Sequence, residues 1–278
     1  MTGALISILL TLLAPGGYTL ARDIPYGEGP RRTLDVYRPK AAAPGAPVVV
    51  FIYGGSWDSG EKGLYRFVGA ALASQGFVTV IPDYRVYPEV SYPSFVQDAA
   101  QAVKWAKTHA GEYGGDPAAL SLMGHSAGGH IAAMLAYDRR WLNAEGLDPA
   151  RDLSAFVGIS GPYDFLPLHS ERLKIIFGPE EARADSQPIT HVDGRGPPGL
   201  FLTGDADTVV DPGNSRRMAA RIVAAGGRSE ARFYPGISHS GSITTFLPIM
   251  RSKAPILADA LAFIREHAAP DASARRAA

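Results

Sequence analysis

Six short apolar runs that alternate with helical patterns constrain the fold of this chain more than any other feature. The runs lack the apolar and polar alternation of a half-exposed strand, as expected when a strand is buried on both faces. They cover residues 48–53, 77–81, 120–123, 156–160, 200–203 and 231–234. The helical patterns cover residues 65–74, 95–109, 127–137, 214–225 and 256–267. Such alternation requires right-handed crossovers, so the sequence predicts an α/β fold with a mostly parallel, doubly wound sheet.

Two alternating segments before these runs extend the predicted sheet at one edge. Residues 22–26 and 33–37 are separated by Gly-Glu-Gly-Pro, which predicts an antiparallel hairpin. A chain of 278 residues is commonly a single domain in this fold class. We therefore expect one folded domain over residues 22–268, followed at 269–278 by a flexible tail of small and charged residues.

The first residues carry an apolar segment for which the sequence leaves two interpretations open. Residues 4–14 are too short to span a bilayer as a helix, but they have the length of a signal-peptide core. No Lys or Arg precedes them, so the basic part of a signal peptide is missing. Residues 1–21 are either the leader of an exported or periplasmic protein, with 1–17 as signal peptide, or an N-terminal helix of a cytoplasmic protein. Such a helix would pack on the domain or on a partner subunit in a homodimer.

Composition excludes several classes of function. The 27 basic and 27 acidic residues balance, so no basic field indicates a nucleic-acid partner. The chain has no cysteine, which excludes a thiol nucleophile, a disulfide and a thiolate metal site. The sequence also predicts no stable membrane span.

One predicted strand-to-helix turn carries a serine between two glycines. Residues 124–128 read Gly-His-Ser-Ala-Gly, directly after an apolar run and at the start of a helical pattern. A strand that turns at once into a helix strains the apex residue and leaves no room for a Cβ two positions away, which accounts for Gly124 and Gly128. The turn also places the Ser126 hydroxyl at a helix N-terminus, where N–H groups face a developing anion. Ser126 is therefore the candidate nucleophile.

A carboxylate follows the predicted strand at residues 200–203. Asp207 is the candidate acid, because a carboxylate at the end of a strand can orient a histidine and stabilise its cationic form. Asp205 and Asp211 are rivals for this role. A local aspartate could instead cap the helix that begins near Asn214.

A histidine among small residues follows the last predicted strand. Residues 236–241 read Gly-Ile-Ser-His-Ser-Gly, a loop from which His239 can reach Ser126 without steric conflict and act as general base, then acid. Of the seven histidines, only His239 gives the chain order Ser, Asp, His. The others lie next to Ser126, in predicted helices or before Asp207.

These segments together resemble the α/β-hydrolase family, and within it the hormone-sensitive-lipase-like carboxylesterases near the acetyl/feruloyl esterase and kynurenine formamidase branch. Gly-Gly-Ser-Trp at 54–57 matches H-G-G-x-W without its histidine, and residues 83–89 are similar to D-Y-R-L-x-P-E. Residues 124–129 match G-x-S-A-G-G, and the spacing around Asp207 resembles G-x-x-D-x-x-V. The likeness extends over about residues 22–267, so it implies that 22–268 is an α/β-hydrolase catalytic domain.

The resemblance implies an oxyanion hole formed by the backbone N–H groups of Gly55, Ser56 and Ala127. Tyr53 stands where the family has a histidine that often anchors this loop, and Ser56 replaces a third glycine. Neither change removes an N–H donor, but the loop needs another means of support. Asp83 and Arg85 are expected to form an ion pair or hydrogen-bonded turn beneath the loop, with a catalytic role as the alternative.

Aromatic residues and one irregular region are candidates for the substrate pocket. Residues 162–199, rich in Pro, Gly and charge, predict a lid or pocket insertion, or else a structural excursion. The aromatic candidates are Trp57, Tyr84, Tyr163 and Phe165, for which burial in the core is the alternative.

The sequence thus predicts a serine hydrolase that cleaves small-molecule carboxylic esters with a short acyl group. Ser126, His239 and Asp207 would form the triad, an acyl-enzyme would be the intermediate, and neither a metal nor an organic cofactor is needed. An amidase or arylformamidase using the same triad is one alternative. A non-catalytic binding protein on the same fold is the other, because a fold alone does not establish activity.

Overall fold

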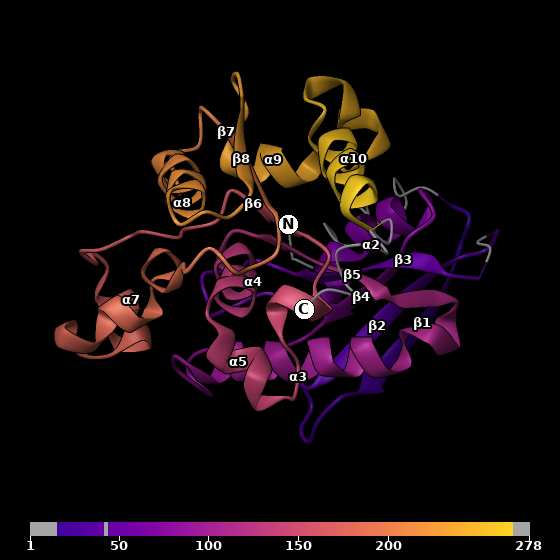
Figure 1. Cartoon of the computed structure of the whole chain (residues 1–278), viewed down its shortest axis with the longest axis horizontal. Coiled ribbons are helices and arrows are strands. Elements are labelled where there is room, and N and C mark those ends of the chain that lie inside the picture. Colours follow the sequence, from indigo (N-terminus) through magenta and orange to yellow (C-terminus); the bar gives the residue numbers. More distant parts are fainter. Residues whose placement is uncertain (1–15, 42–43, 269–278) are drawn as a thin grey trace, which may run out of the picture.

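An eight-stranded sheet forms the centre of the protein (Figure 1). In the computed structural model, which describes residues 16–41 and 44–268, its strand order is β1-β2-β4-β3-β5-β6-β7-β8. The strands are β1 Tyr18–Pro25, β2 Thr33–Pro39, β3 Ala46–Ile52, β4 Val78–Pro82, β5 Gly115–His125, β6 Phe156–Ile159, β7 Gly199–Gly204 and β8 Ser229–Tyr234. β2 pairs antiparallel with β1 and β4, and all other neighbours are parallel. The predicted α/β-hydrolase fold with an antiparallel edge hairpin is confirmed.

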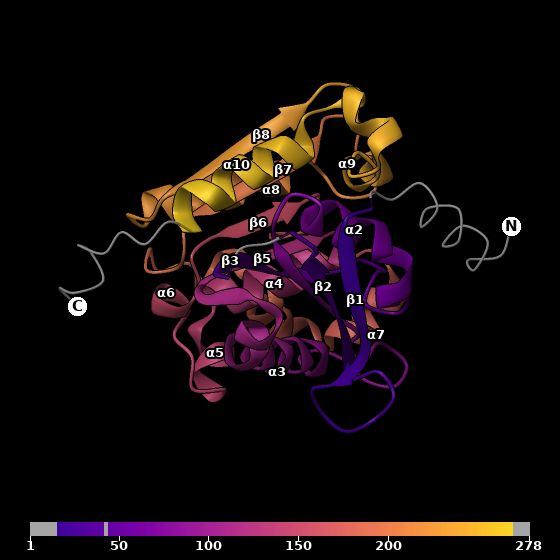
Figure 2. The same ribbon diagram turned by 90° about the vertical axis from the view of Figure 1, so that its right-hand side faces the viewer.

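Helices cover both faces of this sheet. The longer ones are α2 Arg66–Ala73, α3 Ser94–His109, α4 Ala127–Tyr137, α8 Gly213–Ala224 and α10 Ile256–Ala268. Figure 2 shows α10 on one side of the sheet and α3 on the other, where α3 also contacts α4. This cover explains why the apolar runs do not alternate: the side chains of Val48, Val49 and Val50 in β3 are all fully buried, whichever face they point to.

The sequence patterns missed the shorter elements. Among the described residues, four short α-helices were not predicted, and the 3-10 helices were not predicted either. The α-helices are α5 Arg139–Ala144, α6 Pro149–Asp152, α7 Glu171–Phe177 and α9 His239–Thr244. Elements of four to seven residues are too short for an apolar period to be recognised. α7 lies at the left edge of the molecule in Figure 1, within the irregular region 162–199.

The predictions for the two chain ends can be compared with the structure only in part. β1 begins at Tyr18, four residues before the predicted strand, so residues 18–21 belong to the sheet. The rest of the predicted leader, apart from residues 16 and 17, and the predicted tail at 269–278 lie outside the described residues. Within residues 16–41 and 44–268, no helix is long and apolar enough to cross a bilayer.

Strand register brings the candidate residues to one edge of the sheet. Ile52 at the end of β3 pairs with Gly124 near the end of β5, so the loop after β3 and Ser126 start side by side. Gly204 pairs with Tyr234 in the same way, which places the segments after β7 and β8 next to each other. Because these strands are parallel, all four connections leave at the carboxyl edge, where open α/β sheets bind ligands.

Candidate active site

Ser126 lies at the apex of a strained turn between β5 and α4. Its backbone has φ +55° and ψ −127°, a conformation that costs a non-glycine residue roughly 1–3 kcal/mol. A Cβ on Gly124 would lie 2.2 Å from the carbonyl oxygen of Gly128, and one on Gly128 would lie 2.1 Å from that of Ile52. Side chains are therefore sterically excluded at both flanking glycines, as the sequence predicted.

A continuous chain of hydrogen bonds joins Ser126, His239 and Asp207. The Ser126 hydroxyl lies 2.9 Å from Nε2 of His239, and Nδ1 of His239 lies 2.8 Å from Oδ2 of Asp207. With Nδ1–H donating to the carboxylate, Nε2 is left free to accept the serine proton. The three side chains come from residues separated by up to 113 positions in the sequence, and all lie at the carboxyl edge of the sheet.

The second carboxylate oxygen of Asp207 is also engaged. Oδ1 accepts hydrogen bonds of 2.9 Å from the backbone N–H groups of Val209 and Val210. Burial alone would raise the pKa of Asp207, but the hydrogen bond from His239 and these two amides outweigh it and hold the pKa below its ordinary value. Asp207 is therefore a fixed anion beneath the imidazole.

The two rival aspartates have other partners. Asp205 accepts the N–H of Gly236 at 2.7 Å, in the turn after β8. Asp211 accepts the N–H of Gly213 at 2.9 Å just before α8, although Pro212 and not an aspartate is the N-cap residue of this helix. Among the three, only Asp207 contacts His239.

His239 was expected in a loop, but it is the first residue of α9. Ser238 caps this helix, because its Oγ accepts the N–H of Gly241 at 3.2 Å. The carbonyl oxygen of His239 accepts from Ser242 Oγ at 2.6 Å and faces Nε2 of His125 at 3.3 Å. The backbone of His239 is therefore fixed independently of its ring.

His125 and His130 flank the nucleophile and both are buried, yet sequence reasoning set them aside because they do not fit the chain order. Burial, and secondly the electrostatic influence of the neighbouring His239 ring, lower the pKa of His125 to about 3. Burial lowers the pKa of His130 to about 4. Both rings are thus neutral at neutral pH. Their closeness to Ser126 in sequence was the available signal, since residues this near a nucleophile lie in its immediate surroundings.

The loop after β3 faces Ser126 with unengaged backbone donors. Within the part of the chain that the structure describes, no hydrogen bond uses the N–H of Gly55, Ser56 or Ala127. A Cβ on Gly54 would lie 2.8 Å from the Ser126 Cβ, so this loop and the elbow are in direct contact. Free N–H groups beside a serine hydroxyl are suited to stabilise a developing oxyanion.

Tyr53 supports the base of this loop in place of the family's histidine. Its buried ring stacks on Tyr84 at a centroid distance of 4.7 Å, and its hydroxyl donates to Oδ1 of Asp83 at 2.9 Å. The same hydroxyl faces a guanidinium nitrogen of Arg31 at 3.1 Å. Of the two residues expected beneath the loop, Asp83 accepts from Tyr53 there, but Arg85 pairs with Asp98 instead, with hydrogen bonds of 2.7 and 2.8 Å.

A cavity of about 580 Å³ opens beside Ser126. Trp57 and Phe165 line it, whereas Tyr84 and Tyr163 are fully buried in the core. The irregular region contributes residues 162 and 164–170 together with Leu173 of α7, so this part of it is a pocket insertion. Much of the lining is apolar, and Asp164, Asp211 and Arg217 form a polar group on one wall.

No cluster of three or more His, Asp or Glu side chains arranged to hold a metal ion occurs among the described residues. Ser126 and the residues that carry the free amides, Ser56 and Ala127, line the cavity, and His239 is hydrogen-bonded to Ser126 at its edge. These groups can act as nucleophile, base, orienting acid and oxyanion donors, and acyl transfer requires these four functions.

With this topology, and with a serine, a histidine and an aspartate joined across three strand ends, the protein is an α/β-hydrolase of the hormone-sensitive-lipase-like kind that its motifs resemble. A sequence model of the BD-FAE family matches residues 34–222, more than half of the chain, and the protein belongs to this family.

Curated relatives and solved structures agree with this placement. The chain is 32% identical over 244 residues to the esterase LipC of Mycobacterium tuberculosis, a match that covers 80% of this chain and 60% of the relative. It is 30% identical over 239 residues to an isoprenylcysteine alpha-carbonyl methylesterase of Arabidopsis thaliana, covering 79% of this chain and 56% of the relative. The chain thus spans little more than half the length of these relatives.

Among solved structures, the hyperthermophilic esterase from Pyrobaculum calidifontis superposes with a TM-score of 0.78 at 26% identity, covering 95% of this chain and 91% of that one. Esterase B from Lactobacillus rhamnosis has a TM-score of 0.82 at 19% identity over 98% of this chain and 95% of its own, a likeness of fold.

Proposed function

We propose that this protein is a serine hydrolase that cleaves carboxylic esters through an acyl-enzyme. The observation that carries the proposal is the hydrogen-bonded chain from Ser126 through His239 to Asp207, with donor to acceptor distances of 2.9 and 2.8 Å. The esterase names of the relatives and of the structural neighbours support the same class of reaction.

In the first step, His239 Nε2 takes the proton of Ser126 as the serine oxygen attacks the ester carbonyl carbon. Asp207, held anionic by two amides and by Nδ1–H, stabilises the imidazolium that forms. The N–H groups of Gly55, Ser56 and Ala127 receive the negative charge that develops on the carbonyl oxygen. His239 then gives its proton to the leaving alcohol.

In the second step, water takes the place of the alcohol. His239 removes a proton from the water, the hydroxide attacks the acyl carbon, and Ser126 Oγ leaves as it regains a proton from His239. Each step moves one proton through the same nitrogen, so both depend on the same geometry.

Esters with a short acyl group, such as p-nitrophenyl acetate, are the proposed substrates. The cavity of about 580 Å³ also has room for a considerably larger group than acetyl. Its apolar lining favours the burial of a hydrocarbon or aromatic part of the ester.

Two measurements on the purified protein test the proposal. It should hydrolyse p-nitrophenyl acetate, and a fluorophosphonate should label Ser126 in the wild type but not in Ser126→Ala. A protein that neither hydrolyses activated esters nor reacts with the fluorophosphonate is not a serine hydrolase. Faster turnover of N-formylkynurenine than of aryl esters would instead assign it to amide substrates.

A further inference from the structure

The loop that carries the proposed oxyanion donors has an unfavourable backbone conformation. Gly55, Ser56 and Trp57 have φ values of +148°, +52° and +60°, which puts three successive residues in the left-handed half of conformational space. Only glycine adopts such values without a steric penalty, so Ser56 and Trp57 must be held there by contacts with the rest of the protein. One such contact is the hydrogen bond of 2.9 Å from the N–H of Tyr87 to the carbonyl of Trp57.

The Trp57 side chain provides a second contact. Its indole N–H donates to Nδ1 of His130 at 3.2 Å, and the residue is only 5% exposed. Phe165 stacks on the indole at a centroid distance of 5.7 Å, and Phe177 meets it edge to face at 4.9 Å. The aromatic rings enclose the hydrogen bond and exclude water from it, which strengthens it.

His130 connects this loop with two other parts of the site. It lies one turn after Ser126 in α4, and its backbone N–H donates to the Ser126 carbonyl at 3.2 Å. Because Nδ1 accepts from Trp57, the ring proton is on Nε2, which donates to the carbonyl of Ser186 at 2.7 Å. The ring is fully buried and neutral, so this tautomer and both hydrogen bonds persist at neutral pH.

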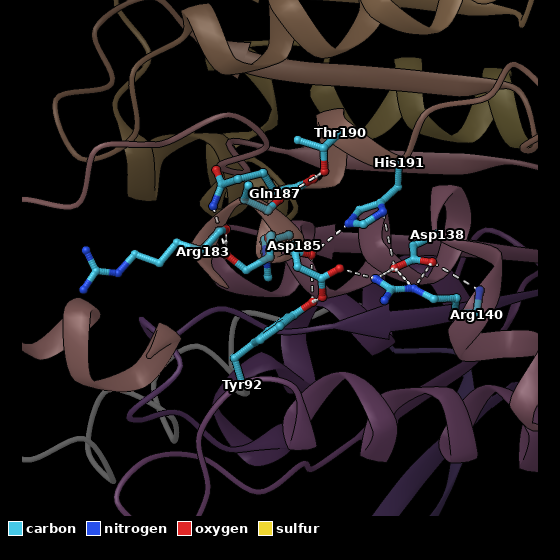
Figure 3. A network of polar contacts seen from close by, with 11 residues as sticks. Tyr92, Asp138, Arg140, Arg183, Asp185, Gln187, Thr190 and His191 are labelled. Atoms are coloured by element: carbon cyan, nitrogen blue, oxygen red, sulfur yellow. Dashed lines mark hydrogen bonds and ion pairs between the residues drawn. The ribbon is translucent and has the colours of Figure 1, made fainter. Parts of the chain in front are cut away.

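The segment that holds Ser186 is itself fixed by a polar network. Figure 3 shows the side chains of Tyr92, Arg140 and His191 converging on Asp185, the residue before Ser186. Arg140 donates to Oδ1 of Asp185 at 2.8 Å, and His191 Nε2 lies 2.8 Å from its carbonyl oxygen. Tyr92 donates to the same residue, at 2.9 Å from its carbonyl oxygen and 3.1 Å from Oδ2. The acceptor of the His130 ring is therefore in a defined position.

We propose that His130 is a positioning residue, which holds Trp57 and with it the backbone N–H of Ser56 in the geometry that faces Ser126. This inference rests on the proposed ester hydrolysis. In this role His130 supports the loop from the nucleophile's own helix, in addition to the support that Tyr53 gives at the base of the loop. Ser126 is linked to His130 through the backbone and Trp57 is linked to it through the ring, so His130 is one of the contacts that set the distance between the nucleophile and the donors.

The experiment compares kcat and KM for p-nitrophenyl acetate in variants of this pair. His130→Phe keeps an aromatic ring of similar size but removes both hydrogen bonds, and we expect kcat to fall about 10- to 100-fold with KM changed less than about 3-fold. Trp57→Phe removes the indole donor and should lower kcat by a similar factor. The kcat of the double variant should be no more than about 2-fold below that of the less active single variant, because the two substitutions remove the same interaction.

A conservative variant and a matched control separate positioning from general stability. In His130→Asn, Oδ1 takes the place of Nδ1 as acceptor for Trp57, so kcat should stay within about 5-fold of wild type. Tyr137→Phe removes a buried hydroxyl from the same helix, one that donates to Pro197 at 3.4 Å, and should leave kcat unchanged. The rate at which a p-nitrophenyl phosphate triester inactivates each variant should follow kcat, because its phosphoryl oxygen also occupies the oxyanion site.

Two outcomes would overturn the proposal while leaving the proposed function intact. In one, His130→Phe melts at a lower temperature but its folded fraction has wild-type kcat, so that the residue is only structural. In the other, the losses of Trp57→Phe and His130→Phe multiply fully. If His130→Phe does not fold, unchanged kcat in Trp57→Phe still contradicts the proposal. An inactive wild type would instead reject the esterase assignment itself.

Discussion

The two sides of the candidate site are held in place by different kinds of contact. On the acid–base side, the segments after β7 and β8 are joined by backbone hydrogen bonds from Asp205 to Tyr234 and from Ala206 to Ile237. On the oxyanion side, the loop after β3 depends on side chains from distant segments, among them Asp83 and His130. Backbone pairing between neighbouring strand ends is available to any sequence, whereas side-chain support depends on particular residues.

The difference suggests how each side should respond to substitution. The acid–base side is rigid because of its backbone, so a change there acts through the chemistry of the group that is removed. The oxyanion side distributes its support over several side chains, so single changes there should displace donors by part of an ångström and reduce the rate by intermediate factors. The predictions below are arranged to test this contrast.

The largest effects should come from the proposed nucleophile and the proposed base. Ser126→Ala and His239→Ala should each lower kcat by about 10⁴- to 10⁶-fold, because neither residue works without the other. The double variant should be little worse than either single one. Steady-state rates with p-nitrophenyl acetate, with circular dichroism to confirm folding, provide the measurement. Fully multiplicative losses would show that these residues do not act as a pair.

Removing the charge of Asp207 should have the next largest effect. Asp207→Asn leaves the geometry nearly intact but loses the anion that stabilises the imidazolium, so kcat should fall by about 10⁴-fold. Asp205→Asn is the matched control, since Asp205 lies two residues away and its side chain accepts from the Gly236 amide rather than from His239. It should keep kcat within about tenfold of wild type. The opposite ranking of the two variants would move the acid to Asp205.

This contrast also explains how much the sequence could predict. Ser126 directly follows β5, and Asp207 and His239 lie shortly after the ends of β7 and β8. The proposed chemistry requires those residue types, so motif and order were enough to predict that the three side chains lie together. The parallel strands could also be predicted, because burial on both faces of the sheet requires uninterrupted apolar runs.

The support of the oxyanion loop could not be predicted in this way. The N–H donors belong to the backbone, which every non-proline residue provides, so residue type does not identify them. Trp57 and His130 are 73 positions apart, and no local pattern links them. Arg85 was likewise assigned to the wrong partner, because Asp98 comes from the following helix α3 and only the fold brings the two together.

A direct test of the contact between the two sides is Gly54→Ala. The added Cβ would lie 2.8 Å from the Ser126 Cβ and 2.9 Å from the carbonyl of His125, so the loop must move away from the elbow. We expect kcat to fall about 10²-fold, because a displacement near 1 Å separates donors from the oxyanion. Gly111→Ala is the control, since a Cβ there meets nothing within 4 Å. Equal kcat values for the two variants would show that the loop is not tightly fitted.

The two buried histidines allow the stability of each side to be compared by pH. His125 supports His239 and His130 supports Trp57, and burial holds their pKa values at about 3 and about 4. In the unfolded chain both have a pKa of about 6.5, so below that pH the unfolded state binds protons that the folded state does not. The free energy of unfolding should therefore decrease as pH falls from 6.5 towards 4, by about 1.4 kcal/mol per pH unit for each histidine.

Urea unfolding at several pH values between 7 and 4.5 measures this dependence. His125→Gln keeps a donor for the His239 carbonyl, and His130→Asn keeps an acceptor for Trp57. Each variant should lower the dependence of the unfolding free energy on pH by the contribution of one histidine, about 1.4 kcal/mol per pH unit. Unchanged slopes in both variants would show that these histidines are protonated in the folded protein as readily as in the unfolded one.

The smallest effect should come from the surface end of the network behind His130. Asp185→Asn removes the charge that pairs with Arg140, but the two side chains are 46% and 54% exposed, so the pair contributes no more than about 1 kcal/mol. The backbone carbonyl of Asp185 keeps its own partners, so Ser186 should move little and kcat should fall no more than about twofold.

Lys174→Gln, which breaks an exposed ion pair with Glu171, should leave kcat unchanged. Because salt screens exposed charges, 0.5 M NaCl should reduce the difference between Asp185→Asn and wild type. A tenfold loss of kcat in Asp185→Asn that persists in 0.5 M NaCl would mean that the exposed ion pair determines the position of the oxyanion loop. His130 would then only connect that pair with Trp57.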